Sequence, residues 1–227
     1  MSFSNRDEES DFLLCEALTR FLIPGSPIID VGAHEGEFLK SIPNIEKFEV
    51  YAFEPLSNSA QVLKIALPSV KVINSAVGKT NGIAKFYENV GSVGSSLLEP
   101  SPAQSSAFLT PKNVLEVKIT RLDNFILQNN IKKISLLKTD AQGLDNEVIK
   151  SAGIYLNPNF IESLLCEVSF HEFYIGQNKY YEIMKTADEA GYFLAGFFPH
   201  FNRKNWLWWA DVLFLPKNEI YSTNILP

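Results

Sequence analysis

Short apolar segments alternate with amphipathic segments along the first third of this chain, and this alternation restricts the fold more than any other feature. The connections are short, so that successive strands are joined through helices, as in parallel sheets. The pattern predicts a parallel sheet covered by helices on both faces. The predicted elements are strands at Pro27–Val31, Phe48–Phe53 and Val70–Val77, a helix from near Glu35 to before Pro43, and a helix at Pro55–Ala66.

The alternation returns after an irregular middle section. Strands and helices are predicted in turn at Ser135–Thr139, Leu144–Ala152, Leu164–Val168 and Tyr180–Ala190. Two further strands, Tyr192–Phe197 and Ala210–Leu215, have no helix between them, which is typical of an antiparallel pair. We therefore predict one α/β domain over residues 1–227, with about seven strands in a mostly parallel sheet and an antiparallel pair at its edge.

Two segments stand outside this alternation. Residues 1–26 are predicted to be an N-terminal helical segment, because Asp11–Ile23 carries an apolar face and Pro24-Gly25 follows it. Residues 91–106 are rich in Ser, Gly and Pro and are predicted to be a loop. Since long loops in compact domains are usually functional or mobile, we expect this loop to lie beside a binding site.

Charge and cysteine content limit the partners and the compartment. The chain has 20 Lys and Arg against 26 Asp and Glu, a formal net charge of −6, and so lacks the basic excess of nucleic-acid-binding proteins. The N-terminus has no apolar signal segment, and the most apolar late stretch, Trp206–Leu215, is too short to span a bilayer. Cys15 and Cys166 lie in apolar patterns typical of buried free thiols. We expect a cytoplasmic protein with no nucleic-acid partner and no membrane span.

The turn after the first predicted strand restricts the ligand. It reads Asp30-Val31-Gly32-Ala33-His34-Glu35-Gly36, and Glu54 ends the second predicted strand. Open α/β sheets bind ligands outside the carboxyl ends of their strands, where the strand order reverses. An acidic residue about 20 residues beyond such a turn can accept hydrogen bonds from ribose hydroxyls. The spacing therefore predicts a ligand that contains ribose.

Three classes of ribose ligand differ in what they require of this turn. A P-loop is excluded because no Gly-Lys-Ser/Thr follows. A dinucleotide fingerprint would need glycines where the chain has His34 and Glu37, and anions in the first helical turn oppose a pyrophosphate. S-adenosylmethionine has no phosphate and carries a sulfonium cation. Asp30 at the strand end suits its ammonium group, directly or through water, so S-adenosylmethionine fits best.

A series of short motifs follows the turn in a recognisable order. They are Asp30-Val31-Gly32-Ala33 with Gly36, Phe53-Glu54-Pro55, Asn74-Ser75-Ala76-Val77-Gly78, Ser95-Ser96-Leu97, Arg121-Leu122-Asp123, Leu137-Lys138-Thr139-Asp140 with Gly143, Glu167, and Asp211-Val212-Leu213-Phe214. With this order and spacing, most of the chain resembles the FkbM-type S-adenosylmethionine-dependent methyltransferases. The resemblance implies a class I (Rossmann-like) methyltransferase fold and methyl transfer to a hydroxyl on a sugar, glycan or other natural product.

The motifs and the resemblance together nominate site residues. The predicted cofactor contacts are Asp30, Gly32, Ala33, His34, Gly36, Glu54, Pro55, Ser75, Ala76 and Asp140, and the predicted acceptor contacts are Ser95, Ser96, Glu167 and His171. The loop of residues 91–106 is accordingly predicted to lie on the acceptor side. The chain departs from the family at His34, where Asn is common, and at Gln142, where Glu is common. An amide is neutral and a poor base, so Gln142 cannot take the place of an acidic metal ligand or proton acceptor. We predict no metal.

Asp140 and His171 are the two candidates for handling the acceptor's proton, because they follow the fourth and fifth predicted strands. An unperturbed Asp, with a pKa of about 3.9, is a weak base, whereas a His with a pKa near 6.5 is matched to neutral pH. We predict that His171 is the base and that Asp140 positions the acceptor or the cofactor. His200 is expected in an exposed turn.

Two rival functions remain open at this point. The same sheet could serve a nicotinamide-dependent oxidoreductase, or a protein that binds the cofactor without catalysis. A methyltransferase would take a small molecule or a glycan as acceptor, and the sequence is compatible with a homo-oligomer. Aromatic residues are dense around the last two predicted strands, and Phe201, Trp206 and Trp208 among them either pack in the core or line an acceptor pocket or a subunit contact.

Overall fold

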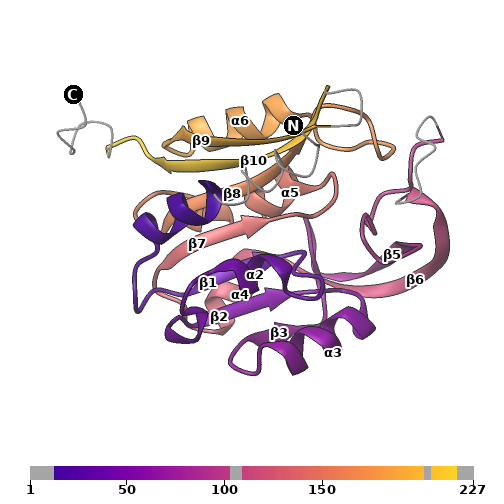
Figure 1. The fold of residues 1–227 in the computed structure, drawn as a ribbon, viewed down its shortest axis with the longest axis horizontal. Coiled ribbons are helices and arrows are strands. Elements are labelled where there is room, and N and C mark those ends of the chain that lie inside the picture. The colour runs from indigo at the N-terminus through magenta and orange to yellow at the C-terminus, as the bar shows by residue number, and fades with distance from the viewer. Residues whose placement is uncertain (1–12, 103–108, 202–205, 219–227) are drawn as a thin grey trace.

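The computed structural model describes residues 13–102, 109–201 and 206–218. A seven-stranded sheet crosses the molecule in the order β3-β2-β1-β7-β8-β10-β9 (Figure 1). The strands are β1 (Ile28–Val31), β2 (Val50–Phe53), β3 (Lys71–Ile73), β7 (Ile134–Thr139), β8 (Ile161–Ser169), β9 (Tyr192–Phe201) and β10 (Leu207–Pro216). The five strands from β3 to β8 run parallel, and β10 pairs antiparallel with both β8 and β9. The predicted fold class is confirmed.

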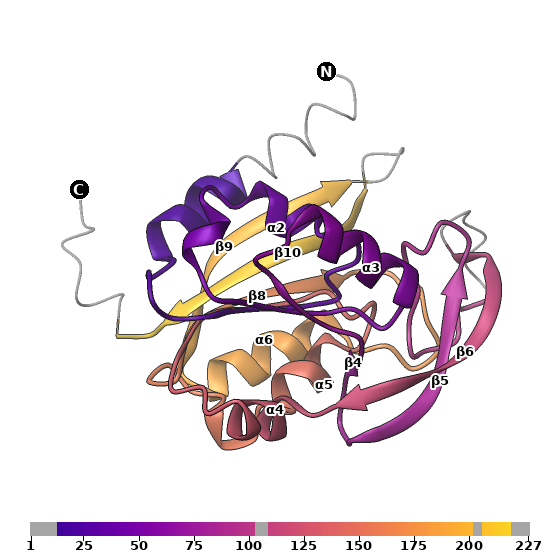
Figure 2. The same cartoon turned by 90° about the horizontal axis from the view of Figure 1, so that it is seen from below.

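Helices cover both faces of the sheet (Figure 2). One face carries the helical residues 13–21, α2 (Glu37–Ser41) and α3 (Ser57–Ala66), and the other carries α4 (Leu122–Gln128), α5 (Asp145–Lys150) and α6 (Tyr180–Glu189). Short 3₁₀ helices occur at Ile45–Lys47 and Gly153–Tyr155. No helix among the described residues combines the length and the apolar character needed to cross a bilayer.

The residues of β1 show how the two faces arise. Ile29 and Val31 pack in the core beneath α4 and α5, while Ile28 packs in the core on the α2 face. Because side chains of a strand alternate between faces, Asp30 points to the same face as Ile28. The parallel register places Lys138 of β7 beside Asp30. Two charged side chains are thereby buried next to each other at the end of the sheet.

A second, three-stranded sheet projects from the main one (Figure 1). It consists of β4 (Ala76–Val77), β5 (Gly82–Asn89) and β6 (Pro111–Thr120), in the order β4-β6-β5. The predicted strand Val70–Val77 is therefore divided between two sheets. Ser75 lies at the division, where its hydroxyl is 3.0 Å from the Lys118 carbonyl oxygen and 2.9 Å from the Thr120 hydroxyl. These long-range hydrogen bonds redirect the chain, and the local sequence contains no sign of them.

The strand order reverses between β1 and β7. From β1 the chain continues to β2 and β3 on one side, and it later returns as β7 on the other. Gly32 leaves β1 with a φ of 78° and donates its amide to the Phe53 carbonyl over 3.0 Å, while the Asp140 amide donates to the Val31 carbonyl over 2.9 Å. The turns after β1 and β7 are thus held against each other at the point where open α/β sheets bind ligands.

The structure describes only part of the two outlying segments. Residues 13–21 of the N-terminal segment are helical, and residues 1–12 lie outside the described residues. Of the loop 91–106, residues 91–102 have no regular secondary structure, and 103–106 lie outside the described residues. The assignment of residues 1–227 to one domain stays a prediction.

Candidate active site

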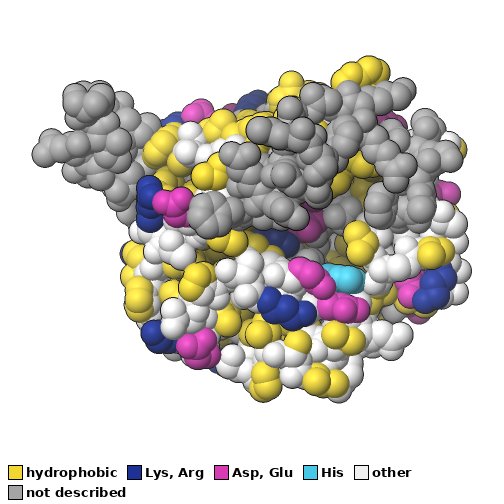
Figure 3. Space-filling model, viewed as in Figure 1, with side chains coloured by type: hydrophobic (Ala, Val, Ile, Leu, Met, Phe, Trp, Pro, Cys, Tyr) yellow, Lys and Arg dark blue, Asp and Glu magenta, His cyan; other side chains and the backbone are white. Residues whose placement is uncertain are grey.

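A cavity of about 540 Å³ opens at the carboxyl ends of the parallel strands. This volume lies within the ~300–1,000 Å³ typical of small-molecule sites. Ten predicted site residues line it: Gly32, Ala33, His34, Glu54, Pro55, Ser75, Ala76, Ser95, Asp140 and Glu167. Acidic side chains and a histidine also gather near the middle of the face seen in Figure 3. The cavity therefore brings together residues from segments that are far apart in the chain.

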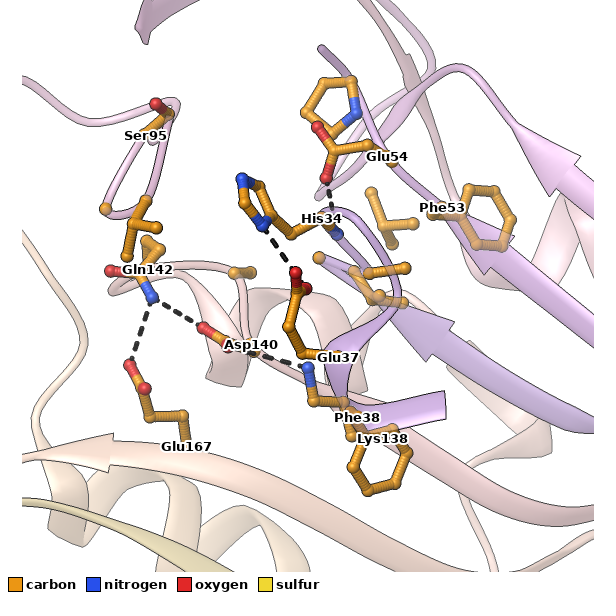
Figure 4. Close-up of a pocket in the computed structure, with 18 of the residues that line it drawn as sticks. His34, Glu37, Phe38, Phe53, Glu54, Ser95, Lys138, Asp140, Gln142 and Glu167 are labelled. Carbon is orange, nitrogen blue, oxygen red and sulfur yellow. Dashed lines mark hydrogen bonds and ion pairs between the residues drawn. The ribbon is translucent and has the colours of Figure 1, made fainter. Parts of the chain in front are cut away.

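Glu54 lies at the end of β2 with its carboxylate almost fully buried. One of its oxygens accepts a hydrogen bond from the His34 amide over 2.9 Å (Figure 4). The other accepts one from the Leu56 amide over 2.7 Å. Burial raises the pKa of Glu54 to about 7, although both hydrogen bonds act to lower it. Each carboxylate oxygen has a second lone pair, so Glu54 can still accept hydrogen bonds from two ligand hydroxyls.

A buried lysine connects two carboxylates on the other side of β1. Lys138 Nζ lies 3.3 Å from Asp30 Oδ1 and 3.6 Å from Asp140 Oδ2. Burial alone would lower the pKa of Lys138, but the carboxylates of Asp30, Asp140 and Asp211 outweigh burial and raise it. Asp30 is completely buried and does not line the cavity, whereas Lys138 and Asp140 do. A ligand ammonium group in the cavity would therefore meet Asp140, and Asp30 would act through Lys138.

Gln142 joins two carboxylates and a tyrosine at the next position along the sheet edge. Its Nε2 lies 2.7 Å from Asp140 Oδ1 and 3.5 Å from Glu167 Oε1 (Figure 4). Its Oε1 is 2.7 Å from the Tyr174 hydroxyl, which is also 2.7 Å from the carbonyl oxygen of Gly94. The backbone of Gln142 has a φ of 50°, so its conformation is left-handed. The side chain thus ties the loop that contains Gly94 to both carboxylates.

The far wall of the cavity is acidic and aromatic. Glu167 on β8 lies directly opposite Asp211 on β10, and Asp211 Oδ2 is 3.3 Å from His200 Nε2. The ring of His200 stacks on Trp209 with a centroid separation of 5.4 Å. Burial, together with nearby carboxylates, raises the pKa of Glu167 well above its ordinary value. This wall offers hydrogen-bond acceptors beside a flat aromatic surface.

Four predicted site residues do not line the cavity. The Nε2 of His171 is 3.1 Å from the Leu207 carbonyl oxygen, and its ring meets the edge of Phe173. The Ser96 hydroxyl donates to the Gln142 carbonyl over 2.8 Å. Asp30 and Gly36 are the other two. Asp30 is fully buried beside Lys138, and Gly36 lies close to the side chain of Leu63. The candidates for proton transfer within reach of a ligand are therefore those on the cavity wall.

Several cavity residues were not assigned to the site from the sequence. They include Glu37, Lys138, Gln142, His200, Trp209 and Asp211. The expectation of an exposed turn at His200 is wrong, because His200 belongs to β9 and is only 8% exposed. Little in the local sequence distinguishes these residues. One usable signal is the position of Asp211 in a strand that neighbours the fifth, since β10 runs antiparallel to β8 and begins at the edge of the sheet where β8 ends.

Comparison with known proteins shows the family to which this chain belongs. The family model described as the methyltransferase FkbM domain matches residues 30–194, well over half of the chain. The chain belongs to the FkbM methyltransferase family. This methyltransferase uses S-adenosylmethionine as its cofactor. No match was found among curated proteins.

Solved structures share the fold of this methyltransferase at low sequence identity. The Methanococcus jannaschii fibrillarin pre-rRNA processing protein is 13% identical, with a TM-score of 0.50 over 86% of this chain and 67% of that one. The magnesium protoporphyrin IX methyltransferase of Synechocystis PCC 6803, solved with bound S-adenosylmethionine, is 10% identical, with a TM-score of 0.49 over 92% of this chain and 79% of that one. At these identities the likeness concerns the fold alone.

The residues of the cavity fit S-adenosylmethionine. Glu54 can hold the ribose, and Asp140 can meet the methionine ammonium group. Lys138 is the only lysine or arginine among the described lining residues, against five acidic ones, so the lining suits a cation and opposes a pyrophosphate. The backbone of Gly32 leaves no room for a side chain, because the Asp140 carbonyl fills that space and brings the turns after β1 and β7 together at the cavity. Within the described residues, no group of three or more His, Cys, Asp or Glu is arranged to hold a metal ion.

Replacing Glu54 by glutamine should weaken the binding of S-adenosylhomocysteine at pH 8 by at least about tenfold, because a hydrogen bond to a charged group contributes roughly 1.5–3 kcal/mol. The pKa of about 7 adds a pH dependence. Below that pH the free protein holds a proton on Glu54, and ligand binding must displace it. The affinity for S-adenosylhomocysteine should therefore fall by up to ~10-fold for each unit by which the pH is lowered.

Calorimetry between pH 6 and pH 8.5 measures both effects. Glu54→Gln should lose the parent's pH dependence together with its affinity. Glu49→Gln is a matched control, since Glu49 pairs with Lys71 outside the cavity. An unchanged affinity in Glu54→Gln would remove Glu54 from the ribose site.

Proposed function

We propose that this methyltransferase transfers the methyl group to a hydroxyl of a sugar, a glycan or another natural product. The observation that carries the proposal is the wall formed by Asp140, Glu167 and Asp211 with Trp209, on the opposite side of β1 from Glu54. Carboxylates accept hydrogen bonds from hydroxyl groups. An aromatic face packs well against the C–H face of a sugar ring. A polyhydroxylated acceptor therefore matches both parts of the wall.

The cofactor supplies a methyl group already activated by the positive charge on sulfur. The protein's contribution is to align the acceptor oxygen, to exclude water and to take up the hydroxyl proton. Asp140, fixed between Lys138 and Gln142, is suited to position the acceptor or the cofactor. The loop of residues 92–95 and Leu97 also lines the cavity, which supports its assignment to the acceptor side.

The charge of the cavity argues against a phosphate-rich acceptor. In the part of the chain that the structure describes, five acidic residues and one lysine line it, and the whole chain has a formal net charge of −6. RNA binding rests largely on phosphate neutralisation by lysine and arginine. Although the fibrillarin neighbour is described as a pre-rRNA processing protein, we do not extend an RNA substrate to this chain.

The experiment is methyl transfer from S-adenosylmethionine labelled in its methyl group. The panel holds neutral sugars and glycans, hydroxylated natural products, phosphorylated sugars, amines and RNA. We expect label in neutral hydroxylated acceptors, with fragmentation mass spectrometry locating it on oxygen. Label found only in amines or in RNA would overturn the proposal.

We also propose that the chain works in the cytoplasm as one domain. Both cysteines, Cys15 and Cys166, are free thiols, which is typical of a reducing compartment. A homo-oligomer stays a prediction, and light scattering after size-exclusion chromatography tests it directly. Fractionation of cells that produce the protein tests the location.

A further inference from the structure

We propose that Glu167 takes up the proton of the acceptor hydroxyl, and that Gln142 is a positioning residue that holds Glu167 beside Asp140. This inference rests on the proposed hydroxyl acceptor. It assigns the proton to a carboxylate on the cavity wall instead of to His171, which the structure places outside the lining.

Geometry is the first support. Glu167 lies on β8, Asp140 follows β7, and these strands are neighbours that end at the same edge of the sheet. The Nε2 of Gln142 lies between the two carboxylates, at 2.7 Å from Asp140 and 3.5 Å from Glu167 (Figure 4). Because its contact is longer, Glu167 receives the weaker of the two hydrogen bonds from Gln142. Asp140 already shares Lys138 and accepts the shorter hydrogen bond, so Glu167 has more unused capacity to accept a proton.

The charges around Glu167 are the second support. Burial disfavours its carboxylate, and the neighbouring carboxylates disfavour it further, while one cation opposes them. The groups that face it come from several elements: Lys138 on β7, Asp140 and Gln142 after it, Asp145 on α5, Tyr174 in the loop before α6, and Asp211, with its partner His200, on the last strand pair. Both influences raise the pKa of Glu167, which makes it a stronger base than an ordinary carboxylate.

A raised pKa also predicts when Glu167 is ready to act. In the free protein, burial and the neighbouring carboxylates favour the protonated form of Glu167 over the ionised form. A cation brought into the cavity favours the ionised form and releases that proton. The cofactor carries a sulfonium cation, whereas its product, S-adenosylhomocysteine, carries a neutral sulfide. The base is therefore generated when the methyl donor is present and is neutralised again after transfer.

The balance of the step is simple. The acceptor oxygen forms a bond to the methyl carbon as the carbon–sulfur bond breaks, and the electron pair of that bond stays on sulfur. The hydroxyl proton moves to a carboxylate oxygen of Glu167, which becomes a neutral carboxylic acid. Charge is conserved, since one cation and one anion are both neutralised.

Proton release on ligand binding tests the inference without any acceptor. Calorimetry at pH 8 in buffers of different ionisation enthalpy gives the number of protons released. There Glu54, with a pKa of about 7, is mostly ionised and contributes little. We expect the parent to release more protons on binding S-adenosylmethionine than on binding S-adenosylhomocysteine, and Glu167→Gln to lose this difference. Glu162→Gln is the matched control, because Glu162 lies on the same strand, pairs with Lys133 and is outside the cavity lining.

Turnover is the second readout, measured with an acceptor that the parent methylates on oxygen. Glu167→Gln should lower kcat by about 100-fold or more with nearly unchanged affinity for S-adenosylhomocysteine. Gln142→Ala should lower kcat less and shift the pH–rate profile, since it loosens Glu167 without removing it. If Glu167→Gln does not fold, Glu167→Asp serves, and we expect it to keep the proton-release difference while lowering kcat.

The outcomes separate the inference from the proposed function. Equal proton release for the two ligands in the parent overturns the inference, and so does parental kcat in Glu167→Gln. A loss of turnover in His171→Ala with none in Glu167→Gln would return the proton to His171. The parent could methylate no hydroxyl while Glu167→Gln still removes the proton-release difference. That result would overturn the proposed acceptor class and would support the titration of Glu167.

Discussion

Replacing Lys138 by methionine is expected to lower the free energy of unfolding by about 3–5 kcal/mol, the usual consequence of breaking a buried ion pair on one side. Lys138 is only 7% exposed and Asp30 is not exposed at all, so the substitution leaves a buried carboxylate without its cation. Methionine fills a similar volume, so little of the loss comes from an empty space. Urea unfolding followed by circular dichroism measures it.

Two further variants make this prediction specific. Lys185→Met removes a lysine that is well exposed and paired with Glu189, which is similarly exposed, and it should lower stability by no more than ~1 kcal/mol. In the double variant Asp30→Asn/Lys138→Met the stranded charge is gone, and part of the stability should return. If Lys138→Met proved no more harmful than Lys185→Met, the buried pair would not be a structural requirement.

Gly32→Ala is expected to destabilise the protein by ~4 kcal/mol or more and to remove cofactor binding. A Cβ on Gly32 would lie 1.9 Å from the carbonyl oxygen of Asp140, and this neighbour is backbone held in the sheet. The turns after β1 and β7 would have to separate, and these turns form the floor of the cavity. Thermal unfolding with and without S-adenosylhomocysteine measures both effects.

Gly25→Ala is the control that isolates the backbone conformation. Gly25 also has a positive φ, 92°, but nothing lies within 4 Å of its absent Cβ. It should therefore show only the ~1–2 kcal/mol that an L-residue loses in the left-handed region. Similar effects of the two substitutions would mean that conformation, and not the close approach of the two turns, explains the glycine at position 32.

The local sequence was sufficient for the elements and for one end of the site. Periodicity located the strands of the main sheet, because a buried strand and an amphipathic helix leave different apolar repeats. Gly32 and Glu54 were found because their function depends on a turn and a strand end that lie close together in the chain. The last two strands have no predicted helix between them, which indicated that they pair antiparallel, and the structure confirms this pairing.

The tertiary structure alone decided the acid–base wall and the separation of the second sheet from the main one. Whether His171 or Glu167 reaches the cavity depends on which face of a strand each side chain occupies and on how the loop after β8 turns back. The pairing of Asp30 with Lys138, and of Glu167 with Asp211, follows from strand register across more than 40 residues of sequence. The sequence by itself determined the order of the elements, the glycine turn and the place of Glu54 at a strand end, since these depend on neighbours along the chain. The residues that surround the acceptor were decided by contacts between distant strands, which no local pattern encodes.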